Sequence, residues 1–237
     1  MDFYISIIVG ICQAVFFNPL DKAIYNSIIN DNALLSRKNW IKPFAGTSNG
    51  IYTRIITGGI YFYLLDYTKN MELFQAAFTV SLTTSTILNP FNVVKFRSYS
   101  DNITTSKSLI KNYNKFGVKF GSIGLCSLII RDFIFNCVYL KYKKENNELI
   151  HNCSIICAAS VVSSPFHYMR NMKYYTNDSY INICKKLFQD VKNTNQNIKS
   201  YFLFKQLGLG YGTVRTVMGV YSGQVMYSTM KDILLSH

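Results

Sequence analysis

The sequence predicts an all-α membrane protein in which six transmembrane helices form three tandem two-helix repeats around a central cavity. Three observations lead to this fold class. The chain has six apolar segments of about 20 residues, a proline motif that recurs at similar spacing, and basic residues concentrated in alternate connections. The 237 residues would form a single domain, with repeats at about 3–70, 71–145 and 149–235 and short surface helices on one side.

The composition argues against an ordinary soluble protein. Apolar residues make up 49% of the chain and charged residues only 16%, against roughly 25% charged residues in soluble domains. The net charge of +13 implies an anionic partner. We expect no nucleic acid, because the basic residues lie between apolar segments and form no single patch. The motifs of hydrolases, metalloproteases and phosphate loops are missing, so we expect no enzyme, and we expect no metal or other cofactor.

Each apolar segment is long enough to cross a membrane of ~30 Å as a helix. Polar or charged residues interrupt every one of them, and such residues must face a bundle interior or a water-filled cavity. The six segments are Phe3–Leu20, Gly50–Tyr67, Leu73–Val94, Phe120–Leu140, Ile150–Tyr168 and Leu207–Tyr227.

The first, third and fifth segments end in one motif: a proline, a polar residue two positions later and, in two copies, a base at the fifth position. The copies read NPLDKAIYN from Asn18, NPFNVVKFR from Asn89 and SPFHYMRNM from Ser164. A basic connection with a short amphipathic helix follows each, and then an aromatic element: PFAG (43–46), VKFG (118–121) or LFKQ (203–206). Three matching copies favour a repeat over isolated helix kinks.

The even segments share a single arginine within the apolar stretch, namely Arg54, Arg131 and Arg215. Six spans put both termini on one side of the membrane, and the long basic connections lie on the other. By the positive-inside rule that basic side corresponds to the bacterial cytoplasm or the mitochondrial matrix. Trp40 is expected to anchor a surface helix at the interface.

Three two-helix repeats with this proline motif resemble the mitochondrial carrier family of solute transporters. The resemblance covers Phe3 to Lys231, although the repeats are shorter than those of the family. It implies a monomeric carrier in the mitochondrial inner membrane, with surface helices on the matrix side and a cardiolipin-like anionic lipid at the matrix-side helix ends. The compact, Asn-, Ile-, Lys- and Tyr-rich chain is also similar to carrier-like proteins of giant DNA viruses, which implies a host mitochondrion.

The resemblance also implies two gates, each built from ion pairs between repeats. The matrix gate would contain Pro19, Asp21, Pro90, Asn92, Lys95, Pro165, His167 and Arg170. The cytoplasmic gate would contain Asp66, Lys69, Lys143, Tyr227 and Lys231. Only Asp21 and Lys95 remain as a charged pair at the matrix gate, with Asn92 a hydrogen-bonding partner for Arg170. We therefore expect weak gates, and the variants Asn92→Asp and His167→Asp to change the transport rate.

By position in the even segments, the substrate site would contain Arg54, Arg131 and Arg215. Three arginines suit a polyanion such as a nucleotide diphosphate or triphosphate, and Tyr52 and Tyr211 would stack a base. The neighbouring Asp132 keeps an amino acid or keto acid open as the cargo, since an acid beside the arginine would hold an ammonium group. A membrane protein that transports nothing is a third interpretation. We expect nucleotide transport by alternating access, with exchange as its mode.

Overall fold

The computed structural model describes residues 2–30, 32–142, 149–193 and 211–235. This part of the chain is helical and contains no strand. Six long α-helices account for most of it, and one shorter helix follows each of two of them. The long helices are α1 (Asp2–Ile29), α2 (Thr47–Tyr67), α3 (Leu73–Asp101), α5 (Leu125–Tyr142), α6 (Leu149–Thr176) and α9 (Tyr211–Leu235). The others are α4 (Thr105–Phe116), α7 (Tyr180–Asn193) and the 3-10 helices η1 (Arg37–Trp40) and η2 (Gly117–Ser122).

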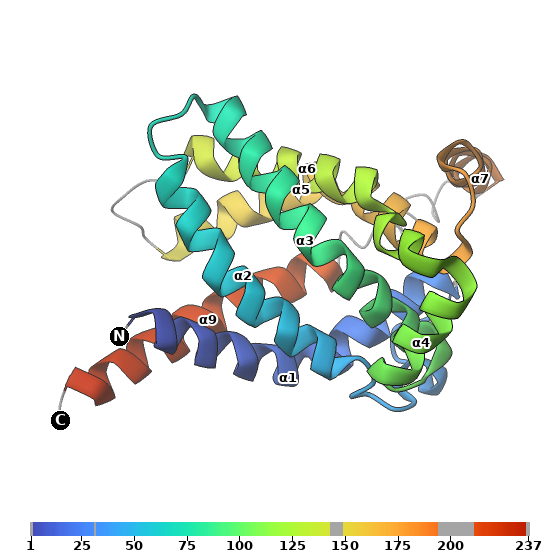
Figure 1. The fold of residues 1–237 in the computed structure, drawn as a ribbon, viewed down its shortest axis with the longest axis horizontal. Helices are drawn as coiled ribbons and strands as arrows, with labels where there is room; N and C mark the ends of the chain where they lie inside the picture. Colours follow the sequence, from blue (N-terminus) through green and yellow to red (C-terminus); the bar gives the residue numbers. More distant parts are fainter. Residues whose placement is uncertain (1, 31, 143–148, 194–210, 236–237) are drawn as a thin grey trace.

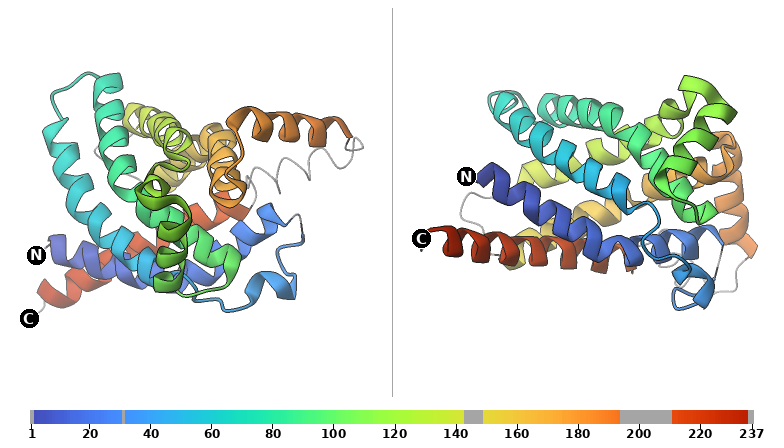
Figure 2. Two further views of the ribbon diagram at one scale, coloured as in Figure 1. Left: turned by 45° about the vertical axis from the view of Figure 1, so that its right-hand side comes forward. Right: turned by 60° about the horizontal axis from the view of Figure 1, so that its bottom comes forward.

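The six long helices form a closed ring in chain order. Each contacts the next, from α1 through α2, α3, α5, α6 and α9, and α9 contacts α1 again. Figures 1 and 2 show the helices grouped around a common axis, with both termini at one end and α4 and α7 at the other. Helices α1, α3 and α6 also contact one another across the ring. We call α1, α3 and α6, which correspond to the first, third and fifth predicted segments, the odd helices, and α2, α5 and α9 the even helices. The contacts among the odd helices close the ring at one end.

Each predicted apolar segment coincides with one long helix, but the odd helices extend further than the sequence suggested. They run about ten residues past Pro19, Pro90 and Pro165 and end at Ile29, Asp101 and Thr176. A proline removes one backbone donor and bends a helix without having to end it. The segments after the prolines make the contacts between odd helices, and we call this end of the ring the proline end.

The burial pattern differs from that of a typical soluble protein, because many polar side chains are buried and many large apolar ones are exposed. Large apolar side chains such as Phe16, Phe74 and Val162 are exposed on the outside of the ring. Asparagine and serine side chains such as Asn89 and Ser81 are buried inside it. A single-layer ring of helices leaves each helix an inner and an outer face, and this sequence puts polar groups on the inner one.

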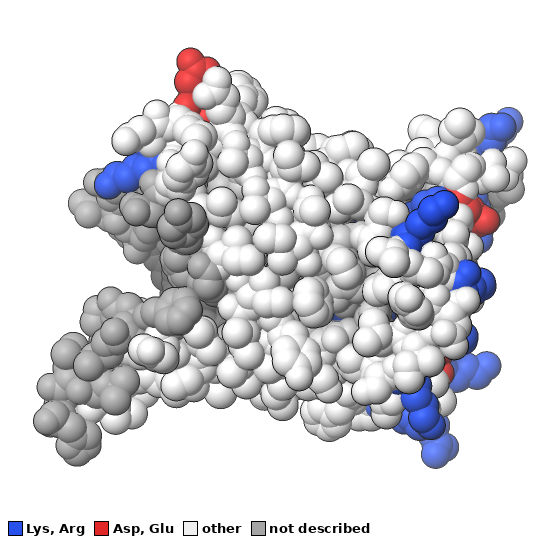
Figure 3. Space-filling model, viewed as in Figure 1, with Lys and Arg blue, Asp and Glu red and all other residues white. Residues whose placement is uncertain are grey.

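The connections at the proline end carry the predicted basic surface. Figure 3 shows lysine and arginine side chains gathered at the end that bears α4 and α7, and a broad band without charge across the middle of the molecule. Trp40 ends the short η1 and donates a hydrogen bond from Nε1 to the carbonyl oxygen of Leu34 at 3.0 Å. The first connection thus has a four-residue 3-10 helix where a short amphipathic helix was expected.

By length and mean hydropathy, one described helix qualifies as a membrane span, over Ile7–Ile29. A second candidate arises if the bent pair Thr105–Ser122 and Leu125–Tyr142 counts as one span.

Candidate functional site: an arginine-lined central cavity

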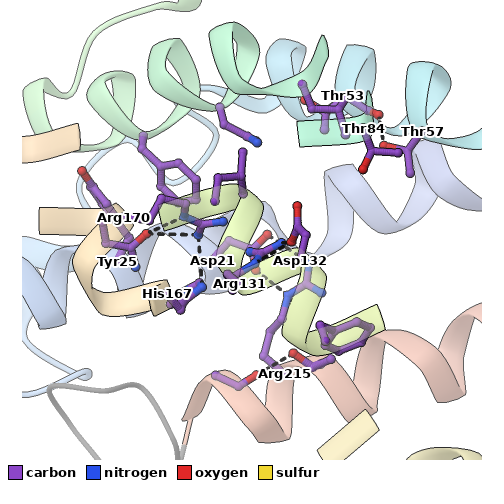
Figure 4. A pocket seen from close by; sticks show the side chains of 18 of the residues that line it. Asp21, Tyr25, Thr53, Thr57, Thr84, Arg131, Asp132, His167, Arg170 and Arg215 are labelled. Atoms are coloured by element: carbon purple, nitrogen blue, oxygen red, sulfur yellow. Dashed lines mark hydrogen bonds and ion pairs between the residues drawn. The ribbon is translucent and has the colours of Figure 1, made fainter. Parts of the chain in front are cut away.

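A cavity of ≈ 510 Å³ lies inside the ring, and all six long helices contribute to its wall. Figure 4 shows the charged side chains turned toward one another, with the threonines of α2 and α3 at one edge. The polar lining consists of Asp21, Tyr25, Thr53, Arg54, Thr57, Thr84, Asn92, Arg131, Asp132, Asn136, His167, Arg170, Asn171, Arg215 and Thr216. The three arginines singled out from the sequence therefore line one cavity, together with a fourth, Arg170.

An aromatic layer closes the cavity at the proline end. The rings of Tyr25 and Phe96 lie 4.8 Å apart between their centroids, and those of Phe96 and Tyr174 lie 5.6 Å apart. Tyr99 packs edge-on against both Tyr25 and Phe96. The Arg170 guanidinium lies over Phe96 at 5.1 Å, a cation–π contact. These residues come from α1, α3 and α6, so one layer joins all three repeats.

Two tyrosine–asparagine hydrogen bonds lock neighbouring repeats together. The Tyr99 hydroxyl donates to Asn18 Oδ1 at 2.7 Å, and the Tyr174 hydroxyl donates to Asn89 Oδ1 at 2.6 Å. Each asparagine directly precedes the motif proline of its own repeat. Each tyrosine stands nine residues after the motif proline of the following repeat. Because both bonds are fully buried, each should stabilise the closed proline end by about 1 kcal/mol.

The amide groups of the same asparagines hold the chain just before the even helices. Asn18 Nδ2 donates to the carbonyl oxygens of Pro43 and Ala45, and Asn89 Nδ2 to those of Gly121 and Ile123.

A glycine with positive φ follows each of these contacts: Gly46 at +75° and Gly124 at +72°. A Cβ at Gly124 would lie 2.7 Å from the Tyr174 ring, so the backbone turn and the tyrosine fit only with glycine. Gly124, and not Gly121 of the predicted VKFG element, is thus the structural equivalent of Gly46.

The third repeat lacks this lock. Ser164 stands where the other repeats have asparagine, and Ile28 of α1 stands where they have tyrosine. An apolar cluster occupies the α1–α6 contact instead, formed by Ile24, Ile28, Tyr168 and Met172 with Ile183 of α7. The Tyr25 hydroxyl nearby is buried and has no hydrogen-bond partner among the described residues. The three contacts between odd helices are therefore unequal.

Asp21 joins the proline end to the cavity wall. Its carboxylate lies 3.7 Å from Lys95 Nζ of α3, which is the ion pair predicted from the motif. It also accepts two hydrogen bonds from Arg215 of α9, from Nε and, at 3.0 Å, from Nη2. Such a bidentate pair is stronger and more directional than a single contact. Arg215, predicted as a substrate ligand, is thus held by the carboxylate that was predicted to belong to the matrix gate.

Arg131 is also paired with a carboxylate. It donates from Nε and Nη2 to Oδ1 of the adjacent Asp132, and Asp132 Oδ2 accepts a hydrogen bond from Ser85 of α3 at 2.8 Å. Counted from the glycines with positive φ, Arg54 and Asp132 are both eight residues into their repeats' even helices. Asp132, and not Arg131, is therefore the positional equivalent of Arg54.

Two arginines remain without a carboxylate. Arg54 makes no hydrogen bond or ion pair with a described residue, although it lines the cavity. Arg170 contacts His167 Nδ1 at 3.1 Å and donates to Asn171 Oδ1. The cavity wall therefore carries four arginines against two carboxylates, and the excess positive charge belongs to Arg54 and Arg170.

The structure does not bring the two predicted base-stacking residues, Tyr52 and Tyr211, to the cavity. Tyr52 and Tyr211 are 56% and 52% exposed and lie outside the cavity lining. Tyr52 is two residues from Arg54, and residues two apart in a helix point to different sides. The aromatic residues that do line the cavity are Tyr25, Phe96 and Phe135.

The other predicted gate contacts have mixed outcomes. Asn92 lines the cavity, but Arg170 hydrogen-bonds residues of its own helix and not Asn92. Among the cytoplasmic-gate residues, Lys69 is exposed and Tyr227 is half-buried. Lys143 and the side chains of Asp66 and Lys231 lie outside the described residues, as does the LFKQ element.

Sequence reasoning missed Lys22, a fully buried lysine next to Asp21. Its ammonium group donates to the carbonyl oxygens of Ile41 and Lys42 and, at 2.5 Å, to Asn102 Oδ1. Asn102 caps α3 in the left-handed conformation, so Lys22 ties the first connection to the end of α3. A lysine directly after the motif acid was the only available signal.

No protein-family model matches this sequence, and no curated protein matches it.

Proposed function

We propose that the six long helices span a membrane and that the chain is a solute carrier of the mitochondrial carrier type. The exposed apolar side chains and the uncharged band in Figure 3 support this, because lipid can cover the outer face that no protein covers. The shortest of the six, α5, has 18 residues, or about 27 Å of helix. The polar interior then lines a path that lipid does not reach.

The ring also accounts for the low mean hydropathy of most of its helices. Each helix has a polar inner face, so averaging around the helix hides the apolar outer face. In α3, for example, Ser81, Ser85 and Asn89 are buried while Phe74, Phe78 and Leu82 are exposed. A hydropathy threshold finds uniformly apolar spans more readily than helices that line a wet cavity.

The proposed orientation puts the basic proline end in the matrix and both termini on the opposite side. Lysines on α4 and α7 would then meet the anionic lipid of the inner mitochondrial membrane, including a cardiolipin-like lipid at the helix ends. The carrier would act as a monomer, because the cavity is complete within one chain. In this state it is closed toward the matrix by the aromatic layer.

The cargo that we propose is a nucleotide diphosphate or triphosphate. The observation that carries this proposal is the excess of arginines in the enclosed cavity, with Arg54 and Arg170 free of carboxylate partners. Guanidinium groups bind phosphate oxygens in a planar, bidentate geometry. A polyanion can contact both arginines and compete for a third, Arg215, whereas a monoacid would satisfy only one of them.

One observation favours a second candidate, an amino acid carrier, because Arg131 and Asp132 form an arginine–acid pair in the cavity. The contacts of Asp132 count against it. Both of its oxygens are engaged, one by Arg131 and the other by Ser85. An ammonium group would meet a carboxylate that already accepts three hydrogen bonds and has room for about one more, whereas a phosphate meets arginines that form no ion pair with a carboxylate.

Exchange of labelled nucleotides into proteoliposomes tests the proposal. We expect uptake by the wild-type protein and a loss of at least tenfold in Arg54→Ala. Arg37→Ala is the matched control, because Arg37 is exposed on η1 and remote from the cavity lining. Uptake of amino acids and not nucleotides would support the second candidate. No uptake of any anion would support the interpretation that the protein does not transport.

A further inference from the structure

A second cavity of ≈ 370 Å³ adjoins the first and has a different chemical character. Eight lining residues are common to the two cavities: Ile24, Arg54, Arg131, Phe135, His167, Gly212, Arg215 and Thr216. Five residues line the second cavity only, and four of them carry hydroxyl groups: Ser160, Ser163, Ser164 and Thr213, with Ile28 as the fifth. We call this space, between α6 and α9, the hydroxyl lobe.

The hydroxyl lobe has capacity for hydrogen bonds that the protein does not use. The hydroxyls of Ser160 and Thr213 have no hydrogen-bond partner among the described residues. Ser163 and Ser164 donate only to carbonyl oxygens of their own helix, at 3.4 and 2.8 Å. Each of these hydroxyls can still accept a hydrogen bond, and the first two can also donate one.

Away from the hydroxyl groups, the shared arginines and His167, the wall of the hydroxyl lobe is apolar and suits a flat, uncharged group. Ile24, Ile28 and Phe135 provide its apolar surface. A Cβ at Gly212 would meet no atom within 4 Å, so this position leaves open space where α9 passes the cavity. Ligand sites commonly combine such an apolar wall with a few polar groups that fix orientation.

We propose that the hydroxyl lobe binds the uncharged, hydroxyl-bearing and heterocyclic part of the cargo, while the arginines bind its phosphates. This rests on the proposed nucleotide transport and adds a specificity site to it. The sugar would exchange hydrogen bonds with the serines of α6, and the base would lie against Phe135. The serines would then distinguish a nucleoside triphosphate from a polyphosphate of similar charge.

The test compares inorganic tripolyphosphate with a nucleoside triphosphate, using the thermal stabilisation of the full chain in detergent to measure the affinity of each ligand. In the wild type we expect tighter binding of the nucleoside triphosphate. The double variant Ser160→Ala/Ser163→Ala should bind it about five- to tenfold more weakly and bind tripolyphosphate as before. Thr213→Val, which removes a hydroxyl that lines the second cavity only, should have the same selective effect from the α9 side.

Ser154→Ala is the matched control, since Ser154 is an exposed serine on the same helix. Equal loss of both ligands in the variants would overturn the assignment of the lobe, and so would unchanged binding of both. If wild-type protein binds tripolyphosphate without preferring the nucleoside triphosphate, the lobe proposal fails alone. If it binds neither ligand, the proposed function fails and the lobe proposal fails with it.

Discussion

Replacing Asp21 by asparagine removes the only carboxylate that, among the described residues, contacts both the proline end and the cavity wall. Asp21 pairs with Lys95 and accepts a bidentate pair of hydrogen bonds from Arg215. Asparagine has nearly the same size and retains one acceptor oxygen. The change therefore removes the negative charge with little change in packing, and it leaves two cations facing each other without an anion between them.

The magnitude follows from burial. The side chains of Asp21, Lys95 and Arg215 are 21%, 16% and 16% exposed, so water screens them only in part. Removing one member of a fully buried ion pair costs about 3–5 kcal/mol, and partial exposure reduces this to roughly 2–3 kcal/mol here. For a chain of this length, such a loss lowers the melting temperature by roughly 4–12 °C.

Thermal unfolding of the purified protein in detergent measures the effect. Asp101→Asn is the control, because the Asp101–Lys111 pair of 2.7 Å lies at the surface and should contribute less than about 1 kcal/mol. Polyphosphate should bind Asp21→Asn about tenfold more tightly, since Arg215 is released to contact it. A melting temperature within 2 °C of the control, or weaker polyphosphate binding, would refute the reasoning.

Five further substitutions, with Tyr25→Phe and Gly212→Ala as the comparison variants, test the contacts of the proline end through thermal unfolding. Tyr174→Phe loses a buried hydrogen bond and should cost about 1 kcal/mol, whereas Tyr25→Phe removes a buried unpaired hydroxyl and should cost nothing; equal losses would contradict this. Gly124→Ala should cost about 1–3 kcal/mol because of its positive φ and the ring beside it, while Gly212→Ala, in open space, should not destabilise. Lys22→Met leaves three acceptors without their donor and should cost about 2–4 kcal/mol; a neutral result would show that the first connection holds without it.

The repeat was the part of this fold that the sequence could predict. Proline motifs mark equivalent positions whatever the surrounding residues are, so Pro19, Pro90 and Pro165 located the three odd helices. The Asp21–Lys95 pair followed from the same alignment. The tyrosine locks were within reach as well, because asparagine precedes two of the prolines and a tyrosine stands nine residues after two of them.

Contacts across the ring could not be predicted in the same way. The pairing of Arg215 with Asp21 depends on the position and rotation of α9 relative to α1. A close contact between the two helices fixes both. Gln13 of α1 donates a hydrogen bond to the carbonyl oxygen of Gly219 at 2.5 Å, which requires a glycine-rich face on α9. No spacing along the chain contains this information, because the two residues are 206 positions apart.

The pairing of the charges, more than their number, decides which arginines of the cavity an anion could bind. Counting arginines in the sequence gave Arg54, Arg131 and Arg215 equal weight, but two of them already have carboxylate partners. Removing a carboxylate and removing an arginine should therefore act on anion binding in opposite directions. Asp132→Asn frees Arg131 and should strengthen binding, whereas Arg54→Ala removes a cation that has no partner and should weaken it. A site whose arginines served only to balance internal acids would respond to neither change, so the opposite signs are the signature of a cavity built to hold an external anion.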